Sequence, residues 1–442
     1  MRKHKRLGAN IFWLVGDRSF RLLVGFVISG AIARYLGKAG FGAYSYASDI
    51  ALILLPVATM GMEGIVIGEL LKHPDKKNEV LGTALVLRFA GAALAVGLIL
   101  IFARFDRSGP GVDGAAPASL WLIFVASLAF GPQAFDVIDL WFQKNVQSKF
   151  TVLAKGTALT LGAGFKIYLI ARKASVTTFC WALVLDAGLG AVAQIITYTR
   201  RGELILRWRP RWEIARRILG LSWPLIFSGV LVAVCVKVEQ ILVKALLSPD
   251  VLGVYSAAVR LTSQWFFIPT LVLSTVYPLM VEKRGKGENN YRENMQTVFD
   301  LLTGAGYVIA AGATLLGPVL IRLVFGEKYV ESVPILIVQA WSAPILFSAS
   351  ARAQYFLLEN LNIYHIWAAS VGLCVNVALG LFLVPVLGAK GAALSAMGSY
   401  WVSGYLTSWI FPRLRECGRM QTQAFLLPFR PAPLVRALLR KS

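Results

Sequence analysis

The stretch Gly42-Ala43-Tyr44-Ser45-Tyr46-Ala47 is nearly repeated, about half the chain further on, as Gly253-Val254-Tyr255-Ser256-Ala257-Ala258. Each copy follows a short turn-like stretch, Tyr35-Leu36-Gly37 in the first half and Leu246-Leu247-Ser248 in the second. Each copy also precedes a long apolar run that a proline interrupts, Pro56 and Pro269. A half-chain repeat in a very apolar chain is typical of membrane transporters built from two related helix bundles. The repeat therefore predicts a duplicated transporter fold.

The composition is that of a protein that lies in lipid. Hydrophobic residues make up 57% of the chain, charged residues only 15%, and the mean hydropathy is +0.65. Apolar runs of about 20 residues, the length that crosses a bilayer, occur roughly twelve times. The predicted spans are residues 11–34, 43–68, 80–103, 119–142, 151–171, 177–198, 220–244, 254–280, 296–324, 332–357, 364–386 and 390–411. We therefore expect an all-α polytopic membrane protein with about twelve transmembrane helices, in two pseudo-symmetric lobes of about six helices each around a central cavity.

The basic residues predict how the chain is oriented. Lys and Arg near membrane ends stay on the cytoplasmic side. They concentrate on the side of the termini, in residues 2–6, 72–77, 144–149, 200–217, 283–292 and 413–441. Both termini are therefore expected in the cytoplasm. The net charge of +22 reflects this topology and an attraction to anionic membrane lipids, so nucleic acid is not expected as a partner.

The most basic loop divides the chain near its middle. It predicts an N-terminal six-helix lobe (1–199), a basic cytoplasmic linker (200–218), a C-terminal six-helix lobe (219–411) and a basic cytoplasmic tail (412–442). Trp208 and Trp212 lie among the arginines of the linker. Aromatic rings interleaved with basic residues are typical of a segment at the level of the lipid headgroups.

Motifs for catalysis, metal binding and nucleotide hydrolysis are missing from the sequence. No phosphate-binding G-x-x-x-x-G-K-[ST] loop occurs, and the three histidines form no metal-ligand or nucleophile–base pattern. The four cysteines include no closely spaced pair. Neither disulfides, metal nor cofactor are therefore expected, and the chain is not expected to be an enzyme.

Basic side chains lie inside the predicted spans, where a charge costs roughly 2.5 kcal/mol or more at the helix centre. Such residues face a bundle interior or a watery cavity, and cations from several helices would form a cationic lumen suited to an anionic substrate such as a pyrophosphate. Each of these side chains could instead extend so that its charged end reaches the nearer membrane surface. The candidate substrate-binding residues are Arg21, Lys166, Lys237, Arg260 and Arg352.

Acidic side chains form a second, smaller group within the spans. Asp136 and Asp139 lie about one helical turn apart, and Asp17 shares a face with Arg21. Together with Glu239, these carboxylates are candidates for binding a coupling cation. The alternative is that they are structural counter-charges to lysines on neighbouring helices.

Several further stretches carry a resemblance to a known family. They are Ala33-Arg34-Tyr35-Leu36-Gly37-Lys38-Ala39-Gly40-Phe41-Gly42-Ala43-Tyr44, Ser222-Trp223-Pro224-Leu225, Phe325-Gly326-Glu327-Lys328-Tyr329 and Gly388-Ala389-Lys390-Gly391-Ala392-Ala393. With the repeated motif, their order and spacing make the chain resemble the polysaccharide biosynthesis membrane proteins, the Wzx-type lipid-linked oligosaccharide flippases. These belong to a superfamily with the lipid II flippases and the multidrug and toxin extrusion antiporters. The chain departs from the family pattern at Lys38, where proline is usual, whereas the acidic residue often found in the seventh span is matched by Glu239.

The resemblance implies a function in surface polysaccharide biosynthesis. Family members move undecaprenyl-pyrophosphate-linked oligosaccharide repeat units from the inner to the outer leaflet of the bacterial cytoplasmic membrane by alternating access. The cationic lumen would hold the pyrophosphate while the polyprenyl tail stays in lipid. Expected partners are this lipid-linked glycan, anionic lipids, a polysaccharide polymerase and a chain-length regulator. O-antigen, capsule and exopolysaccharide repeats all fit.

Three other functions remain open at this point. A cation-coupled multidrug extruder of the same superfamily would favour an acidic cavity, which the excess of in-span cations opposes. A membrane-embedded glycosyltransferase would need a sizeable outward loop, and the longest predicted one, about residues 104–118, is short. A non-transporting scaffold for glycan enzymes would not need the in-span charges at all.

Overall fold

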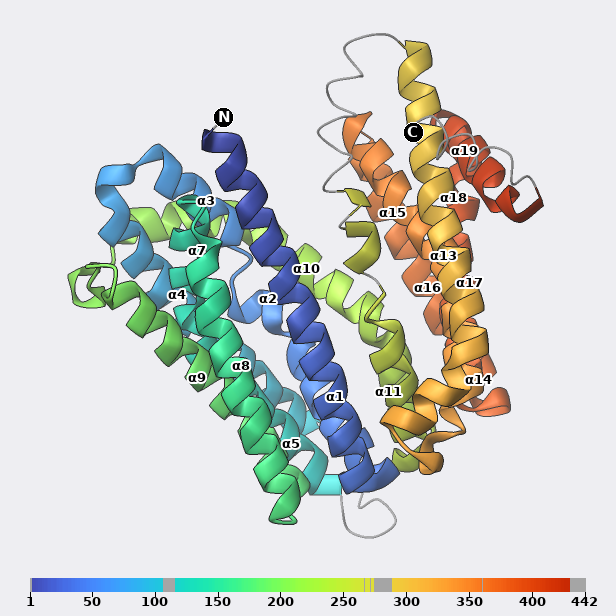
Figure 1. The fold of residues 1–442 in the computed structure, drawn as a ribbon, viewed down its shortest axis with the longest axis horizontal. Coiled ribbons are helices and arrows are strands. Elements are labelled where there is room, and N and C mark those ends of the chain that lie inside the picture. The colour runs from blue at the N-terminus through green and yellow to red at the C-terminus, as the bar shows by residue number, and fades with distance from the viewer. Residues whose placement is uncertain are drawn as a thin grey trace. The chain divides into compact units, whose positions relative to one another are not determined.

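The computed structural model describes residues 2–105, 116–265, 267–270, 272–273, 288–359 and 361–429, and within them every regular element is a helix. The chain divides into two compact units, unit 1 from Met1 to Lys237 and unit 2 from Val238 to Ser442. Figure 1 colours unit 1 from blue to green and unit 2 from green to red. The predicted all-α fold is confirmed.

Unit 1 is built from long helices joined by short turns. Its elements are α1 (Arg2–Ile53), α2 (Leu55–Ala58), α3 (Glu63–Lys72), α4 (Lys77–Phe105), α5 (Ala116–Ser127), α6 (Phe130–Gln133), α7 (Val137–Lys144), α8 (Ser148–Ala171), α9 (Val176–Thr199) and α10 (Trp212–Leu246), with short 3-10 turns η1 (Pro74–Lys76), η2 (Ala134–Asp136) and η3 (Ile205–Arg207). Helix α10 begins in unit 1 and continues without interruption into unit 2.

Unit 2 contains the remaining helices. They are α11 (Pro249–Thr262), α13 (Glu288–Val324), α14 (Ser332–Ala340), α15 (Ala343–Leu358), α16 (Asn362–Leu387), α17 (Ala389–Trp401), α18 (Thr407–Ile410) and α19 (Arg415–Phe425), with the 3-10 turns η4 (Glu327–Tyr329), η6 (Pro412–Leu414) and η7 (Leu427–Phe429). A π-helix, η5 (Val402–Leu406), joins α17 to α18. Single π turns are rare inside helices and frequently mark functional sites.

Among the described residues, eight helical segments are long and apolar enough to cross a membrane. They are Ser19–Ile53, Pro74–Ile101, Leu120–Lys144, Val176–Thr199, Trp212–Leu246, Tyr291–Val324, Ser332–Leu358 and Ile363–Leu387. Of the other four predicted spans, 151–171 falls on α8 and 390–411 on the run from α17 to α18. The span 43–68 is divided among α1, α2 and α3, and 254–280 lies partly outside the described residues. Together these helices make the chain a multi-pass membrane protein.

Glycine determines two of the turns that connect spans. Gly37 has a φ of 69°, and Gly388 has a φ of 61°. This left-handed region is open to glycine and strained for other residues, so a glycine allows the chain to reverse within one residue. Both glycines follow a leucine, in the stretches Leu36-Gly37 and Leu387-Gly388, which explains why these short motifs stand out in the sequence.

Three spans that contain a proline are broken helices, whereas α10, α13 and α16 continue through theirs. In unit 1, the helix around Pro56 ends in a turn at Thr59–Met62, where Met60 and Gly61 both have φ near 55°. The span around Pro132 is divided into α5, α6, η2 and α7. In unit 2, a break at Trp341–Ser342 comes just before Pro344. Discontinuous helices at membrane depth are tolerated where they are buried in protein or line a cavity, and they often build binding sites.

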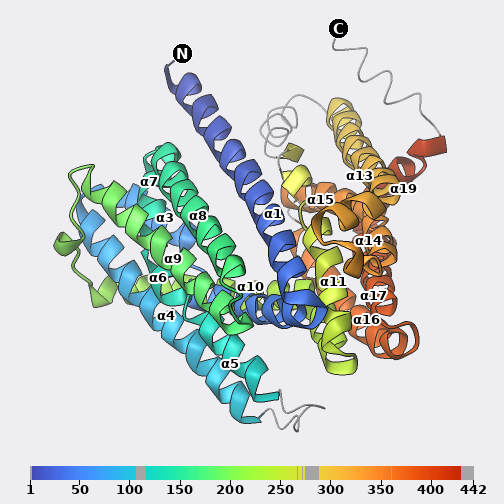
Figure 2. The same ribbon diagram turned by 60° about the horizontal axis from the view of Figure 1, so that its bottom comes forward.

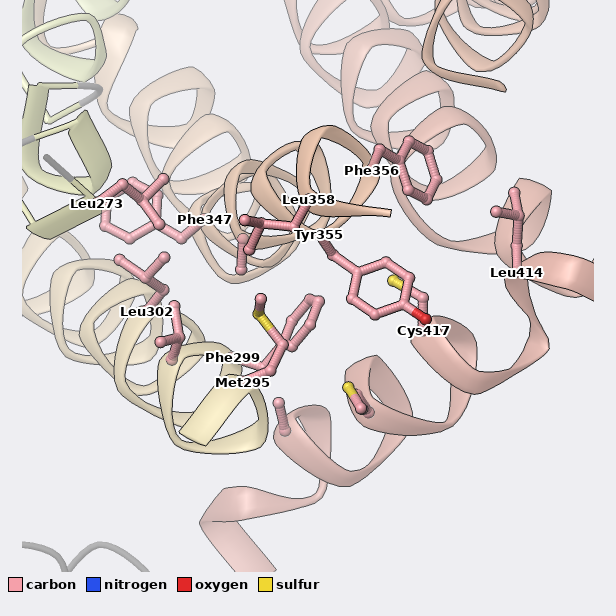
Figure 3. Close-up of a cluster of buried hydrophobic side chains, with 14 of the residues drawn as sticks. Leu273, Met295, Phe299, Leu302, Phe347, Tyr355, Phe356, Leu358, Leu414 and Cys417 are labelled. Carbon is pink, nitrogen blue, oxygen red and sulfur yellow. The ribbon is translucent and has the colours of Figure 1, made fainter. Parts of the chain in front are cut away.

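Helices pack side by side within each unit. In unit 1, α8 lies against both α9 and α1, and Figures 1 and 2 both show α8 and α9 side by side. In unit 2, α13 packs on α15 and α19, where Phe299, Phe347 and Phe356 are almost completely buried. Figure 3 shows this cluster, to which Cys417 of α19 also belongs.

The basic segment near the middle of the chain is partly anchored in unit 1. Trp208 is buried and donates a hydrogen bond from its indole Nε1 to the Tyr198 hydroxyl, 3.2 Å away. Ile214 and Ile218 belong to the same buried cluster, whereas Trp212 is 77% exposed. The division between the compact units lies further on, inside α10. The predicted linker (200–218) and lobe boundaries stay predictions, and the last part of the predicted tail lies outside the described residues.

Candidate functional site

The most extensive charged cluster of unit 1 centres on Lys155 of α8. Its Nζ lies 2.8 Å from Asp136 Oδ1 and 3.0 Å from Asp139 Oδ2. Gln194 of α9 donates a hydrogen bond to Asp136 over 2.8 Å. The break in the span places Asp136 at the end of η2 and Asp139 in the first turn of α7, so both carboxylates reach the same ammonium. Two of the four predicted ion-coupling carboxylates therefore form ion pairs with the same lysine.

A second pair lies at the other broken helix. Arg88 of α4 is only 2% exposed, and its Nη2 lies 3.3 Å from Glu63 Oε1. Glu63 opens α3 directly after the turn at Thr59–Met62. The Arg88 Nε has no hydrogen-bond partner. A buried guanidinium with an unmet donor retains capacity to bind a further acceptor.

The predicted site residue Lys166 is buried between two adjacent helices. Its ammonium forms an ion pair with Asp186 of α9. Gly162 lies one turn before Lys166 on α8, and a side chain there would collide with the Asp186 carboxylate. The glycine thus lets Asp186 lie against α8 within reach of Lys166.

Lys237, a second predicted site residue, is paired with a carboxylate that we did not predict. Its Nζ lies 2.7 Å from Oδ1 of Asp49 on α1, and the two side chains are 18% and 7% exposed. Asp49 lies just after the repeated motif. It is seven residues beyond Gly42, and Arg260 is likewise seven residues beyond Gly253. That register was the available signal for Asp49, because it places a charge at the same point of both repeats.

In unit 2, the predicted residue Glu239 is buried near the start of the unit. It accepts a 2.8 Å hydrogen bond from Nδ2 of Asn376 on α16. The neighbouring Gln240 is also buried, and its Oε1 has no hydrogen-bond partner. A carboxylate in such a place needs donors around it, and the asparagine supplies one of them.

Arg352 of α15 lies in the interior of unit 2, where it is 3% exposed. Its Nη1 donates to the hydroxyls of Thr407, at 2.9 Å, and Ser408, at 3.3 Å, directly after the π-helix. Ser408 in turn donates to Gln421 of α19. The Arg352 Nε has no partner, and no carboxylate among the described residues lies within ion-pairing distance of this guanidinium. Its burial favours a structural role over direct contact with a substrate.

The remaining predicted site residues are less enclosed. Arg21 lies half-buried on α1, and Arg260 lies half-buried in the last turn of α11, where its carbonyl accepts a hydrogen bond from Gln264. The side chain of Asp17 lies outside the described part of the chain. The assignment of all these residues to one substrate site stays a prediction.

Metal-binding geometry is not found in the described part of the chain, since no three His, Cys, Asp or Glu side chains come together there. None of the four cysteines forms a disulfide with another. On α19, outside the spans, burial raises the pKa of the Cys417 thiol to about 12, although the nearby Arg352 opposes the shift. This thiol is therefore an uncharged packing group at neutral pH.

The family of this chain follows from a comparison of sequences. The family described as "Polysaccharide biosynthesis protein" matches residues 31–334, which is more than half of the chain. The chain belongs to this family. The resemblance found in the sequence motifs is thereby confirmed.

Proteins similar to this chain carry the names of transporters. A protein of Shigella flexneri, named "Putative O-antigen transporter", is 24% identical over 421 residues, 92% of this chain and 97% of the relative. The structure is similar to that of the lipid II flippase MurJ in an inward closed conformation, with a TM-score of 0.64, 13% identity and coverage of 95% and 92% of the two chains. It is also similar to an inward-facing multidrug resistance MATE family transporter, with a TM-score of 0.66, 14% identity and coverage of 91% and 96%. These structural likenesses establish the transporter fold.

Proposed function

We propose that this protein is a flippase that moves undecaprenyl-pyrophosphate-linked oligosaccharide repeat units from the inner to the outer leaflet of the bacterial cytoplasmic membrane, for surface polysaccharide biosynthesis. Membership of the polysaccharide biosynthesis family and the O-antigen transporter relative support this assignment. Both termini are cytoplasmic, in keeping with the distribution of basic residues. A polymerase and a chain-length regulator use the exported product.

The observation that carries this proposal is the set of lysines held inside the helices of unit 1. Lys166 and Lys237 are largely enclosed, and each forms an ion pair with a carboxylate on another helix. A membrane protein retains such charges at depth when they serve a pathway or a site. An ammonium on a flexible stem can turn from a carboxylate to a phosphate oxygen, since both are anionic acceptors. The proposed substrate contacts are Lys166 and Lys237, with Arg21 and Arg260 as further cations.

Direction is supplied by an ion gradient that acts through carboxylates of the interior. Asp136 and Asp139 are the foremost candidates, because Lys155 sits between them at 2.8 Å and 3.0 Å. A proton or metal cation that replaced the ammonium would release Lys155 and allow α7 and α8 to shift. Asp17 and Glu239 complete the proposed set.

A multidrug extruder is the second candidate, because the fold is shared with a MATE family transporter. Buried carboxylates such as Glu239 could serve a cationic drug. Two readouts separate the candidates, namely accumulation of a lipid-linked glycan and export of a cationic dye. An extruder predicts dye export with no change in lipid-linked glycans.

The test is mass spectrometry of lipid-linked glycans in cells that lack the protein. We expect a pyrophosphate-linked oligosaccharide to accumulate, wild-type protein to clear it, and Lys237→Gln to fail although it reaches the membrane. Lys77→Gln is the matched control, because Lys77 is also ion-paired, to Glu203, but at the first residue of α4. Absence of any accumulating glycan in the deletion strain would overturn the flippase assignment.

A further inference from the structure

The ion pair between Lys237 and Asp49 has an unusual place in the chain. Lys237 is the last residue of unit 1, on the helix α10 that continues into unit 2. Asp49 lies on the second part of α1, beyond the turn at Gly37. The 2.7 Å contact therefore ties the helix that links the units to the helix that carries the first repeated motif.

The two repeats carry opposite charges at this point. Asp49 in the first repeat corresponds to Arg260 in the second, when the chain is aligned on the motifs that begin at Gly42 and Gly253. Four of the six motif positions that precede them are buried in both copies, including Tyr44 and Tyr255. The packing of the motif is thus repeated while the charge is reversed, so packing alone does not explain why residue 49 is acidic.

A carboxylate beside a substrate-binding lysine acts as a competitor of the substrate. The carboxylate of Asp49 and the oxygens of a diphosphate bind an ammonium by the same charge-assisted hydrogen bond. A diphosphate carries more charge and more acceptor oxygens, so it can displace a single carboxylate. Once displaced, Asp49 would remain 7% exposed without the ammonium. A buried unpaired charge is strongly unfavourable, and a carboxylate relieves that cost by binding a proton.

We propose that Asp49 is an internal counter-ion which the diphosphate of the substrate displaces from Lys237, and that the displaced carboxylate binds one proton from the accessible aqueous side. This inference rests on the proposed function, since it takes a polyprenyl diphosphate as the ligand. When the lipid leaves, Asp49 gives up its proton and the Lys237–Asp49 pair forms again; because this proton moves with the lipid, Asp49 is separate from the carboxylates proposed to bind the driving ion. Substrate binding and proton uptake are thereby coupled at one residue, and the pair returns α10 to its resting contact with α1.

Other charged groups near α1 already have partners. Of the helices packed against α1, α8 carries Lys155 and Lys166 and α9 carries Asp186 at membrane depth. Lys166 pairs with Asp186, and Lys155 pairs with the carboxylates of η2 and α7. Helices α2 and α5 contribute no charged residue. Lys237 is the charged side chain that the structure places against Asp49.

The experiment measures binding of undecaprenyl pyrophosphate to the purified full-length protein in nanodiscs, by calorimetry in two buffers of different ionisation enthalpy. For the wild type, we expect uptake of about one proton per lipid bound. For Asp49→Asn, we expect binding about tenfold tighter, because the competitor is gone, and no proton uptake. Asp49→Glu keeps a carboxylate and should keep the proton uptake, and it stays informative if the asparagine variant does not fold. Glu203→Gln, which removes the partner of Lys77, is the control and should match the wild type in both measurements.

Each outcome bears on a different claim. If the wild type does not bind undecaprenyl pyrophosphate, the proposed function fails and this inference with it. If the wild type binds but Asp49→Asn binds with equal or lower affinity, or still takes up a proton, Asp49 has only a structural role and the inference alone is overturned. Loss of proton uptake in Asp49→Glu would also overturn it.

Discussion

The two units stabilise a charged side chain in their interior in different ways. In unit 1, buried lysines are paired with carboxylates from neighbouring helices, as in Lys166–Asp186 and Lys237–Asp49. In unit 2, Arg352 is held by the neutral hydroxyls of Thr407 and Ser408. A pair of opposite charges can be exchanged for a charged ligand, whereas a guanidinium held by hydroxyls keeps its own charge uncompensated. The difference suggests that unit 1 supplies the exchangeable contacts and that Arg352 fixes the architecture of unit 2.

The largest expected effect comes from removing one partner of a buried pair in unit 1. Asp186→Ala leaves the Lys166 ammonium at 11% exposure without its carboxylate, which should destabilise the protein by about 3–5 kcal/mol. Thermal unfolding in detergent, followed by tryptophan fluorescence, measures this loss. The double variant Asp186→Ala, Lys166→Met should recover most of it. If Asp186→Ala is as stable as the wild type, the Lys166 ammonium is not held in a buried place once its carboxylate is removed.

The next prediction tests whether the basic segment around Trp208 packs in the core of unit 1. Trp208→Ala removes a 9% exposed ring and its hydrogen bond to Tyr198, which should cost about 3 kcal/mol, in the range of large-to-small core changes. Trp212→Ala, at a site that is 77% exposed, should change stability by less than about 0.5 kcal/mol. Unfolding midpoints in detergent compare the two. Equal effects would mean that the basic segment is not anchored in unit 1.

Removal of the Arg352 charge should be milder than the change at Asp186. Arg352→Met leaves two hydroxyls that can bond elsewhere, and Thr407 already donates to the Ser403 carbonyl. We expect a cost of about 1–2 kcal/mol, the value of lost hydrogen bonds without a stranded charge. Lipid-linked glycan export should persist in cells with this variant. Abolished export by a stably folded Arg352→Met protein would return Arg352 to the substrate site.

The smallest effect is expected at Cys417, a buried residue of the unit 2 core. Its thiol is fully buried and its pKa is raised to about 12, so at pH 7.5 it is protonated and shielded. A maleimide should therefore leave Cys417 unmodified in the folded protein and label it after denaturation, as peptide mass spectrometry can show. Reactivity should increase only as the pH approaches 12. Rapid labelling at neutral pH would mean that α19 detaches from the core.

Sequence reasoning reached the fold because the determining signals are local. The repeated motif, the long apolar runs and the Leu-Gly turns at Gly37 and Gly388 each act within a few residues of the chain. The family motifs likewise identified the class of transporter. The in-span position of Lys166 and Lys237 could also be predicted, because a charge in an apolar run is visible in any window.

The partners of these charges could not be predicted, since they depend on contacts between distant segments. Lys237 and Asp49 are 188 residues apart, and Asn376 reaches Glu239 across 137 residues. Asp49 was overlooked because it lies near the middle of a mixed polar and apolar stretch. Arg352 was assigned to the lumen on depth alone. Its hydroxyl partners, Thr407 and Ser408, lie 55 and 56 residues further along the chain, directly after a π-helix.

Helix α10 carries two of these contacts within one turn. Lys237 bonds to α1 of unit 1, and Glu239 bonds to α16 of unit 2. Residues two apart on a helix point in nearly opposite directions, because each step turns the helix by about 100°. An inserted or deleted residue between them would swing one side chain away from its partner, whatever residue was added. We therefore expect the length of this segment to be fixed among relatives, while their length variation collects outside the helices.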